Sequence, residues 1–440
     1  MHASQFNIVL PGPTDRTFVY NSFTDHCCEL DAELADLYRP GAPFDGAPLP
    51  AEHESFFEAD GHDEVGEYEG MLEQTLADDS ELQFTIATTL ACNFACSYCY
   101  QHSMQHRPSM TRATASEVAA WMLTRIACHQ PERVVCKFIG GEPLLNSEAM
   151  FHILTALAQP LREADIELTL SMTTNGWFLE PALISRLQAF APLTVVVTLD
   201  GVGDAHNRTR PLRNGQPTFA RIMKNLVRLR GICRPIINGL YLDDPQPLFK
   251  LVDYLADHAL QDHIAAIRLG PATPGLAHPD WANDFAAANC VQKTCEIIAL
   301  HRHILEAGFC VADQIACGPC QALRKHSYAL DPIGDLYLCA ETYGRPEFRL
   351  GSIASASQLR EKDRPPLRAG CRRCEYLPLC GGGCPSEHTM RLHRSAPPPC
   401  NKPYLETVGL YLIRERHLGQ DVPNPFTEGV LHGNPQEAAS

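Results

Sequence analysis

Short apolar runs alternate with amphipathic helical stretches through the middle of this 440-residue chain. Helical periodicity separates the apolar runs, near 113–129, 147–163, 180–190, 217–231 and 247–260. Regular alternation of strand and helix predicts an α/β fold with a parallel sheet and right-handed crossovers. Six such units suit a partial or complete barrel, in which the chemistry lies at the carboxyl ends of the strands. The runs that predict strands are LQFTIATT (82–89), RVVCKFI (133–139), IELTLSM (166–172), LTVVVTL (193–199), PIINGL (235–240) and IAAIRL (264–269).

The segment before residue 82 has a different pattern. Short β-rich runs fill residues 5–30, and Asp31 is placed to cap a short helix, AELADLY, that stops at Pro40. An acidic helical stretch follows near 62–79. These features predict a small, separate α+β unit over residues 1–80.

The segment after the predicted sheet is rich in cysteine and poor in apolar residues. Residues 310–400 combine short turns, one hairpin (YALDPIGDLYLCAE) and nine cysteines, so bound metal is expected to supply much of the stability. A last helix is predicted near 404–417, and a disordered tail from about 420. The predicted organisation is 1–80, 82–275 for the sheet region, 276–309 as a linking helix, 310–400, and 401–440 for the final helix and tail.

Charge is unevenly distributed along the chain, whose formal net charge is −16. Residues 1–82 hold 19 acidic residues and only two basic ones, Arg16 and Arg39, while the remainder is nearly neutral. Such acidity disfavours nucleic acid as a partner and suits a basic one, although a solvated acidic face that aids solubility is the simpler alternative. The sequence shows no apolar run of about 18–20 residues and no secretory signal, so we expect no membrane association and a cytoplasmic location.

The chain has nineteen cysteines, and an odd number of cysteines cannot all be paired in disulfides. In a cytoplasmic protein they favour metal or catalytic thiolates. Directly after the first predicted strand stands Cys92-x3-Cys96-x2-Cys99. Three thiolates in one loop can bind three irons of a cubane and leave the fourth open to a chelating ligand. A zinc loop is the alternative, with His102 nearby as a fourth ligand.

The cysteine loop, with Tyr98 before its last cysteine, resembles the radical S-adenosylmethionine (SAM) enzymes. Further motifs of that family follow at the ends of the next three predicted strands, at Gly140–Pro143, Thr173–Asn175 and Thr198–Asp200. His206-x3-Arg210 resembles the next family segment, whose arginine pairs with the SAM carboxylate. The resemblance also implies that Gly140 and Gly141 let the backbone approach the ligand and that Glu142 accepts from the SAM ammonium group. The residues that it assigns to SAM are Tyr98, Gly140, Gly141, Glu142, Pro143, Thr173, Thr174, Asn175, Thr198, Asp200 and Arg210.

The same resemblance implies the fold and the chemistry. The fold would be a partial (β/α)6 TIM-like barrel. The reduced cluster would pass one electron to SAM, which yields methionine and a 5′-deoxyadenosyl radical that abstracts a hydrogen atom from the substrate. An electron donor such as flavodoxin or ferredoxin is then an expected partner.

The downstream cysteines match the seven-cysteine pattern of the SPASM extension of these enzymes. The match is Cys320-x13-Gly334-x4-Cys339, then Cys371-x2-Cys374-x5-Cys380-x3-Cys384, and finally Cys400. The resemblance implies two auxiliary [4Fe–4S] clusters besides the SAM cluster, three in all. Zinc is the alternative metal in such four-thiolate sites. The implied ligand sets are Cys317, Cys320, Cys339 and Cys384 for the first, and Cys371, Cys374, Cys380 and Cys400 for the second; without Cys317 the first would have an open iron.

Radical SAM enzymes with this extension commonly modify peptides or proteins. The segment 1–80 resembles the winged-helix-like domain that binds the leader of a precursor peptide by β-augmentation. The leading hypothesis is a maturase of ribosomally made peptides that forms an oxidative cross-link, with a C–C cyclophane favoured over C–S or C–O bonds.

Two alternatives remain. An anaerobic sulfatase-maturing enzyme, which forms formylglycine, has an aspartate after the cysteine that follows the hairpin, whereas here Ala340 follows Cys339 and Glu341 comes next. A non-catalytic iron–sulfur carrier or peptide-binding scaffold would not need SAM motifs. No catalytic base is evident, and Glu341 and Asp200 are weak candidates for one.

Overall fold

The structure is a computed structural model. It describes residues 1–11, 16–46, 50–99, 101, 104, 106–271, 290–312, 320–360, 362, 367, 370–386, 400 and 402–418. The tail beyond 420, Cys317 and residues 276–289 of the predicted linking helix 276–309 therefore lie outside the described residues.

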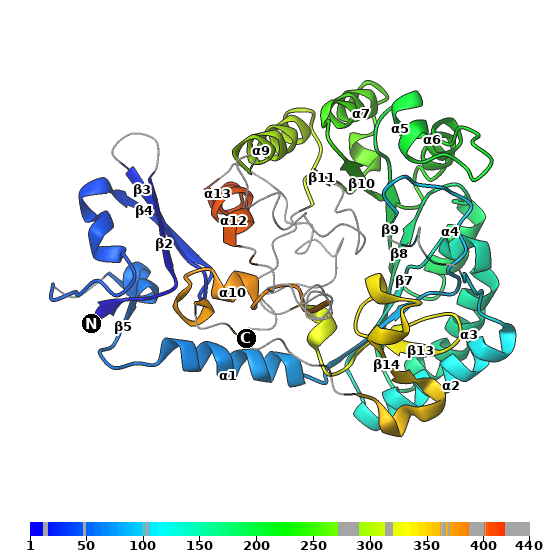
Figure 1. The fold of residues 1–440 in the computed structure, drawn as a ribbon, viewed down its shortest axis with the longest axis horizontal. Helices are drawn as coiled ribbons and strands as arrows, with labels where there is room; N and C mark the ends of the chain where they lie inside the picture. The colour runs from blue at the N-terminus through cyan, green and yellow to red at the C-terminus, as the bar shows by residue number, and fades with distance from the viewer. Residues whose placement is uncertain are drawn as a thin grey trace.

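A nine-stranded sheet in the order β11-β10-β9-β8-β7-β6-β12-β13-β14 forms the centre of the larger part of the molecule (Figure 1). Its first six strands pair in parallel, and each coincides with one of the six predicted strands. The fold is thus mixed α/β with a large, mostly parallel sheet. The strands are β6 (Glu81–Ile86), β7 (Arg133–Phe138), β8 (Glu167–Thr174), β9 (Leu193–Thr198), β10 (Ile236–Tyr241) and β11 (Ala266–Pro271).

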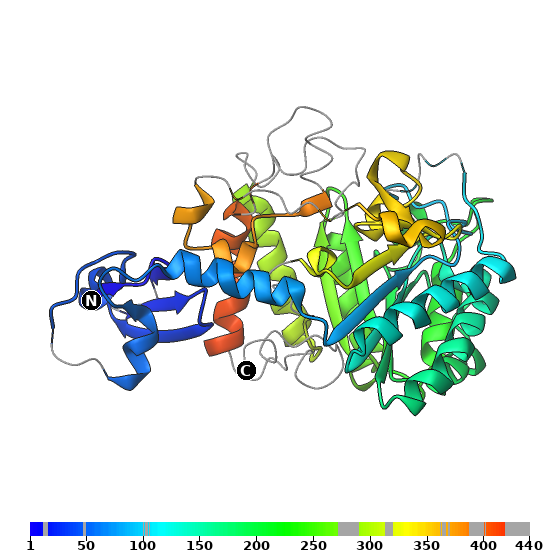
Figure 2. The same ribbon diagram turned by 90° about the horizontal axis from the view of Figure 1, so that it is seen from below.

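Helices cover one face of this sheet, which we call its outer face (Figures 1 and 2). Alternate strand residues such as Phe84, Cys136 and Leu170 are buried against these helices in the main apolar core. All five helices predicted between the strands are confirmed, and the short α5 is an addition. They are α2 (Arg112–His129), α3 (Ser147–Glu163), α4 (Pro181–Gln188), α5 (Asp204–Thr209), α6 (Phe219–Arg228) and α7 (Gln246–Asp257).

The predicted hairpin is confirmed as β12 (Ser327–Leu330) and β13 (Asp335–Tyr337), with β14 (Arg349–Ser352) beside it. It is not an isolated hairpin, because β12 pairs in parallel with β6 and extends the sheet. Tyr328 stacks on Phe84 with ring centroids 5.7 Å apart. The expectation that bound metal must supply most of the stability of 310–400 is therefore too strong for the hairpin, which shares the core of the sheet.

The N-terminal unit contains the three strands predicted there. Strands β2 (Asn7–Pro11), β3 (Arg16–Asn21) and β4 (His26–Asp31) form an antiparallel sheet, and β1 (His2–Ala3) pairs with β5 (Phe57–Glu58). The stretch Ala32–Tyr38 is a 3-10 helix, and the predicted cap is wrong: Asp31 makes no capping hydrogen bond. Its carboxylate instead accepts from Arg16 Nη1 at 2.8 Å across the sheet, where an arginine offers a charged donor.

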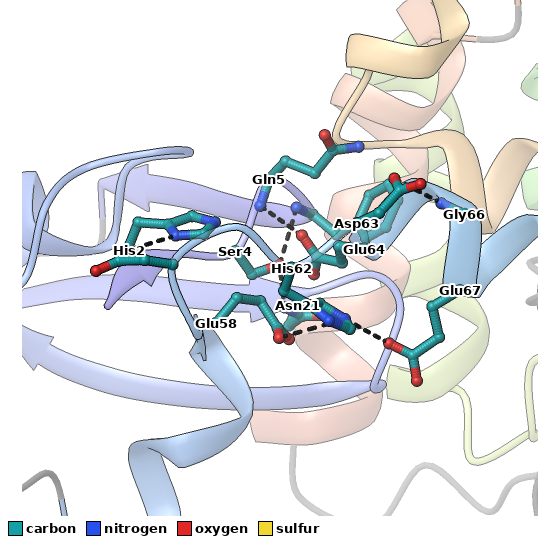
Figure 3. Close-up of polar contacts among 12 residues, drawn as sticks. His2, Ser4, Gln5, Asn21, Glu58, His62, Asp63, Glu64, Gly66 and Glu67 are labelled. Atoms are coloured by element: carbon teal, nitrogen blue, oxygen red, sulfur yellow. Dashed lines mark hydrogen bonds and ion pairs between the residues drawn. The ribbon is translucent and has the colours of Figure 1, made fainter.

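The acidic helix is confirmed as α1 (Glu64–Ala77), capped by Asp63 Oδ1, which accepts from Gly66 N at 3.0 Å. A buried polar cluster fastens its first turn to the N-terminal strands (Figure 3). The Glu64 carboxylate accepts from Ser4 Oγ and, at 2.9 Å, from Gln5 N, and Asn21 Nδ2 donates to Ser4 Oγ at 3.0 Å. Sequence patterns predicted the helix but not this buried carboxylate.

The N-terminal unit also packs on the second cysteine region and the last helices (Figure 2). Ile8, Phe18 and Tyr20 share an apolar cluster with residues of α10 (Leu377–Cys380) and of the C-terminal helices. Ser22 Oγ donates to Glu375 O at 2.6 Å. The helices involved are α9 (Cys290–Glu306), α12 (Lys402–Tyr404) and α13 (Leu410–Leu418), the last two joined by a π-helical turn, Leu405–Gly409. Among the helices described, none has the length and apolar composition that crossing a bilayer requires.

Candidate functional site

The loop with Cys92, Cys96 and Cys99 lies just beyond β6, at the carboxyl end of the parallel sheet. The end of α5 and the residues that follow it hold this loop through two backbone hydrogen bonds. Ala95 N donates to Pro211 O at 2.9 Å and Ser97 N donates to Thr209 O at 3.0 Å. Two segments more than 100 residues apart therefore form one wall of the site.

The three thiols are half-buried. Phe94 N donates to Cys92 Sγ at 3.4 Å, and Asn175 Nδ2 lies 3.9 Å from the same sulfur. Burial raises the pKa of the Cys92 thiol to about 11, so a thiolate there requires a strongly charged partner such as bound iron. Across the described residues, no group of three His, Cys, Asp or Glu side chains is arranged to hold one metal ion. A cubane does not require such convergence, because each thiolate binds a different iron.

Gly140 and Gly141 follow β7 and lie against the chain segment that leads into the cysteine loop. A Cβ atom on Gly140 would come within 2.4 Å of Thr89 O, and one on Gly141 within 2.1 Å of Ala91 O. Gly141 N donates to Thr89 O at 3.0 Å. The resemblance implied glycines that admit a ligand; the described contacts give them a second role, because only glycine lets the two backbones meet here.

Glu142 is completely buried at the ends of β7 and β8. Its Oε1 accepts from Thr174 Oγ1 at 2.8 Å and from Leu144 N at 3.1 Å, and its Oε2 accepts from Asn175 N at 2.7 Å. Burial raises the pKa of this carboxyl, while these three donors act in the opposite direction. The carboxylate thus ties two strand ends together, and Oε2 keeps a lone pair for a further donor.

Tyr98, Asp200 and Arg210 form a chain of short hydrogen bonds beside the cysteines. Arg210 Nη1 donates to Tyr98 Oη at 2.6 Å, and Tyr98 Oη donates to Asp200 Oδ2 at 2.6 Å. Arg210 is 8% exposed, and its Nε has no hydrogen-bond partner. A buried guanidinium with an unused donor fits the carboxylate that the resemblance assigns to it.

The two candidates for a catalytic base differ in their surroundings. Asp200 is buried, and besides Tyr98 it accepts from Thr209 Oγ1 at 3.1 Å and from Leu240 N at 3.2 Å. Its contacts are those of a structural anchor between strand ends. Glu341 is exposed and lies near the Cys320 and Cys339 thiols, whose pKa it helps to raise after the larger effect of burial.

The remaining residues assigned to SAM also lie at strand ends. Thr173 and Thr174 end β8, Thr198 ends β9, and Pro143 begins the turn after Glu142. Asn175 joins two of these segments, because its Nδ2 donates to Asn93 Oδ1 at 2.8 Å. The structure therefore brings every residue of this predicted set to the same edge of the sheet.

The second cysteine region is described in part. Cys339 follows β13, and Cys320 stands close enough to raise its pKa, which burial chiefly raises to about 11. Burial also raises the pKa of Cys374, with Cys400 among the neighbours that add to it. These proximities link one pair within each predicted ligand set. The other predicted ligands are Cys384, Cys371 and Cys380, which are half-buried, and Cys317, which lies outside the described residues.

Sequence reasoning missed two residues that shape the site. Arg213 Nε donates to Cys92 O at 2.6 Å, and Asn93 pairs with Asn175. His206, which the sequence placed in the segment of Arg210, is buried and structural: its Nδ1 accepts from Asp200 N at 3.1 Å. Burial lowers the pKa of His206 to about 3, so the ring is neutral. The signal for Arg213 was its position in the segment that contains Arg210.

Comparison with known proteins bears on this site. Residues 86–255 match the model of the Radical SAM superfamily. The chain is 20% identical over 233 residues to a serine-type anaerobic sulfatase-maturating enzyme of Bacteroides thetaiotaomicron, an alignment that covers 45% of this chain and 56% of the relative. It is 26% identical over 287 residues to an uncharacterized protein of Archaeoglobus fulgidus, covering 60% and 65%. The chain thus spans less than two thirds of the length of these curated relatives.

Two solved structures share the fold. One is anSMEcpe with bound AdoMet, with a TM-score of 0.58 and 17% identity, covering 76% of this chain and 98% of that one. The other is Streptococcus suis SuiB bound to the precursor peptide SuiA, with a TM-score of 0.50 and 14% identity, covering 90% and 98%. The family match spans β6 to α7 and includes the cysteine loop and the polar strand ends described above. Residues 86–255 thus resemble the Radical SAM superfamily, and the chain shares its fold with anSMEcpe and SuiB.

Proposed function

We propose that the protein is a radical SAM/SPASM maturase that abstracts a side-chain hydrogen from a ribosomally made precursor peptide and forms an oxidative cross-link. One observation carries the proposal. The cysteine loop and the polar motifs at four successive strand ends are joined by hydrogen bonds into a single site at the carboxyl edge of the sheet.

The cofactors in this proposal are SAM and three [4Fe–4S] clusters. When bound, SAM and its cluster supply a 5′-deoxyadenosyl radical. The chain orients SAM: Arg210 offers its unused Nε to the carboxylate, and Glu142 offers Oε2 to the ammonium group. The Tyr98–Asp200 hydrogen bond holds the guanidinium in place, since Tyr98 Oη is also its acceptor.

The N-terminal unit is proposed to bind the leader of the precursor. Strand β4 is an edge strand of the three-stranded sheet, so its outer backbone groups are available for β-augmentation. Around this edge lie the exposed acids Glu29, Glu33 and Asp36, together with the exposed apolar side chains of Leu34 and Leu37. Such a surface suits a basic, amphipathic leader. SuiB, which matches over 90% of this chain, was solved with its precursor peptide.

A cross-link is the favoured product, with a C–C bond preferred to C–S or C–O. Forming such a bond removes two hydrogen atoms, that is two protons and two electrons, from the peptide. The abstracted hydrogen atom takes one proton and one electron. The second proton would go to a base or to solvent, and the second electron would pass to the auxiliary clusters that the Cys320–Cys400 region would hold. That region joins the sheet through β12, and a flavodoxin or ferredoxin is the proposed external partner.

The test is to identify short open reading frames beside this gene, to co-express each with it and to follow the encoded peptide by mass spectrometry. A cross-link lowers the mass by about 2 Da, the two hydrogens removed. The peptide from cells that express Cys96→Ala should keep its original mass. Anaerobic, reduced enzyme should also cleave SAM to 5′-deoxyadenosine. Absence of that product with all clusters present would exclude the proposed chemistry.

A formylglycine-forming enzyme is the second candidate, because a sulfatase-maturating enzyme and the anSMEcpe structures are among the similar proteins. Oxidation of serine to an aldehyde also removes about 2 Da, so mass alone does not separate the two. An aldehyde reacts with hydroxylamine, whereas a cross-link does not. Fragmentation that fails between two linked residues supports the cross-link. A chain that binds peptide but never cleaves SAM would instead be a scaffold.

A further inference from the structure

The inner face of the parallel sheet, opposite the helices, is mixed polar and apolar. Leu82, Phe84, Ile267 and Leu269 point into the helix-covered core, so the residues between them point to the inner face. Its two acidic residues, Glu81 and Glu167, are the first residues of β6 and β8; beyond the first residue of each strand, this face carries two cations and no acidic residue. From β6 to β11 it presents Glu81, Gln83, Thr85, Arg133, Val135, Lys137, Glu167, Thr169, Ser171, Thr173, Thr194, Val196, Thr198, Ile236, Asn238, Leu240, Ala266, Arg268 and Gly270.

Arg268 on β11 is a positioned cation whose charge has no partner among the described residues. Its Nε donates to Asn238 Oδ1 on β10 at 2.9 Å, and the parallel register places these two residues side by side. No carboxylate lies within ion-pair distance of it among the described residues. Burial lowers the pKa of Arg268, and no charged neighbour contributes to that shift. Among the described residues, the hydrogen bond of its Nε to Asn238 is the one that its guanidinium makes.

Two other arginines of this protein are paired with carboxylates. Arg133 lies 2.9 Å from Glu167, and Arg349 lies 2.7 Å from Asp335. Lys137, on the same face of the sheet as Arg268, donates to Gln321 Oε1 at 2.8 Å. Burial lowers the pKa of Lys137, while the Glu81 carboxylate and the Cys320 thiol act in the opposite direction. Removing a charge from water is costly unless it gains a counterion. Arg268 is therefore oriented by an amide and has no counterion within the part of the chain that the structure describes.

We propose that Arg268, positioned by Asn238, binds a carboxylate of the peptide substrate, so that the modified segment contains an aspartate or glutamate. This inference rests on the proposed function, because it assumes that a peptide enters the inner face. The same chemistry is present in the SAM carboxylate, but the unused Arg210 Nε beside the cysteine loop is placed for that group. A guanidinium fork binds a carboxylate through two parallel hydrogen bonds.

The test uses the anaerobically reconstituted full-length enzyme with SAM and without reductant. The probes are acetyl-Gly-Asp-Gly-amide and its matched partner acetyl-Gly-Asn-Gly-amide, with binding followed by ligand-observed NMR. The variants are Arg268→Gln, Arg268→Lys, and Arg228→Gln as a control at an exposed position of α6. We expect the acidic peptide to bind at least about 10-fold more tightly than the amide peptide, a preference of about 1.4 kcal/mol. Arg268→Gln should abolish the preference, Arg268→Lys should keep part of it, and Arg228→Gln should leave it unchanged.

Three outcomes would overturn the inference. The acidic and amide peptides could bind equally, or Arg268→Gln could bind the acidic peptide as the parent enzyme does. An increase in the SAM dissociation constant of Arg268→Gln, with peptide binding unchanged, would assign the arginine to SAM. The proposed function is judged separately, by 5′-deoxyadenosine formation after reduction. Arginine-dependent binding of the acidic peptide without that product would keep this site and exclude the enzyme.

Discussion

The N-terminal unit and the inner face of the parallel sheet carry opposite charge. The first 82 residues have 19 acids against Arg16 and Arg39, with the acids mostly on the surface. The strands of the inner face carry Arg133, Lys137 and Arg268 against Glu81 and Glu167, three cations to two acids and thus a net charge of +1, with both acids at the first residue of a strand. A peptide that suits both surfaces has a basic leader and an acidic modified segment. Charge would then set the direction in which the precursor lies across the enzyme.

The cysteine loop and the N-terminal unit also differ in how tightly their backbones are packed. Near the cysteine loop, glycines allow direct backbone contact, whereas Gly70 in α1 has nothing within 4 Å of the position of a Cβ atom. The following experiments test these differences, from the largest expected effect to the smallest.

Gly141→Ala should inactivate the site. The new Cβ would lie 2.1 Å from Ala91 O, so the chain before Cys92 has to move. We expect SAM cleavage to fall by at least about 100-fold, roughly the loss that 1 Å of misplacement can cause, together with a loss of bound iron. Gly70→Ala is the matched control, and it should raise the stability of the helix by up to about 1 kcal/mol. Measurements are 5′-deoxyadenosine yield, iron per chain and thermal unfolding. Full activity of Gly141→Ala would show that the backbone contact is dispensable.

The double variant Glu29→Lys/Glu33→Lys should weaken binding of the precursor by about 10-fold or more at low salt, and by less at high salt. SAM cleavage in the absence of peptide should not change, because these acids lie on the N-terminal unit. Glu73→Lys, an exposed position of α1, is the control for net charge. Equal binding of the precursor by the parent and the double variant would show that these acidic residues serve solubility and do not bind the precursor. The measurement is fluorescence anisotropy of labelled precursor.

Glu64→Ala should lower the stability of the N-terminal unit by about 1–3 kcal/mol, because it leaves buried donors at Ser4 and Gln5 without an acceptor. Glu67→Ala removes only an exposed contact with His62, at 2.9 Å, and should cost less than about 1 kcal/mol. Hydrogen exchange of residues 1–80 measures both variants. Similar exchange in the two would show that the cluster of Figure 3 does not fasten α1.

The contact between the N-terminal sheet and α13 should weaken as pH rises. Asp25 Oδ1 lies 3.4 Å from His417 Nε2 and 2.6 Å from Arg416 Nη2, with Tyr20 and Cys27 on the same side. The hydrogen bond to Asp25, followed by Cys27, raises the pKa of His417 to about 9. Because the pKa of His417 is higher in the folded state, this contact stabilises the folded state to its full extent at pH values below the unfolded pKa of about 6.5. That stabilisation, of the order of 1–2 kcal/mol, is lost as the pH passes 9.

Exchange of α13 amides at pH 6.5 and 9.5, corrected for intrinsic rates, measures this effect. Asp25→Asn should remove most of the difference between the two pH values. An unchanged difference in that variant would assign the pH dependence to another group.

Much of the fold followed from local pattern. The six parallel strands and the helices between them were predicted because one buried face and a turn or cap define each element over fewer than 20 residues. The Asp31 cap was wrong because its carboxylate bonds Arg16, an interaction across strands that no local pattern encodes. Pairing of β12 with β6 was not predicted for the same reason, since it joins Ser327 to Gln83.

The sequence by itself determined the order of the cysteine and SAM motifs, the α/β class and the acidity of the first 82 residues, because spacing, periodicity and charge are properties of the linear chain. Only the tertiary structure decided how these parts face one another. It placed Arg268 beside Asn238 with no carboxylate partner among the described residues, buried Glu64 under the N-terminal strands and packed that unit on the Cys374 region. The physical reason is that burial and charge pairing depend on neighbours that are distant along the chain.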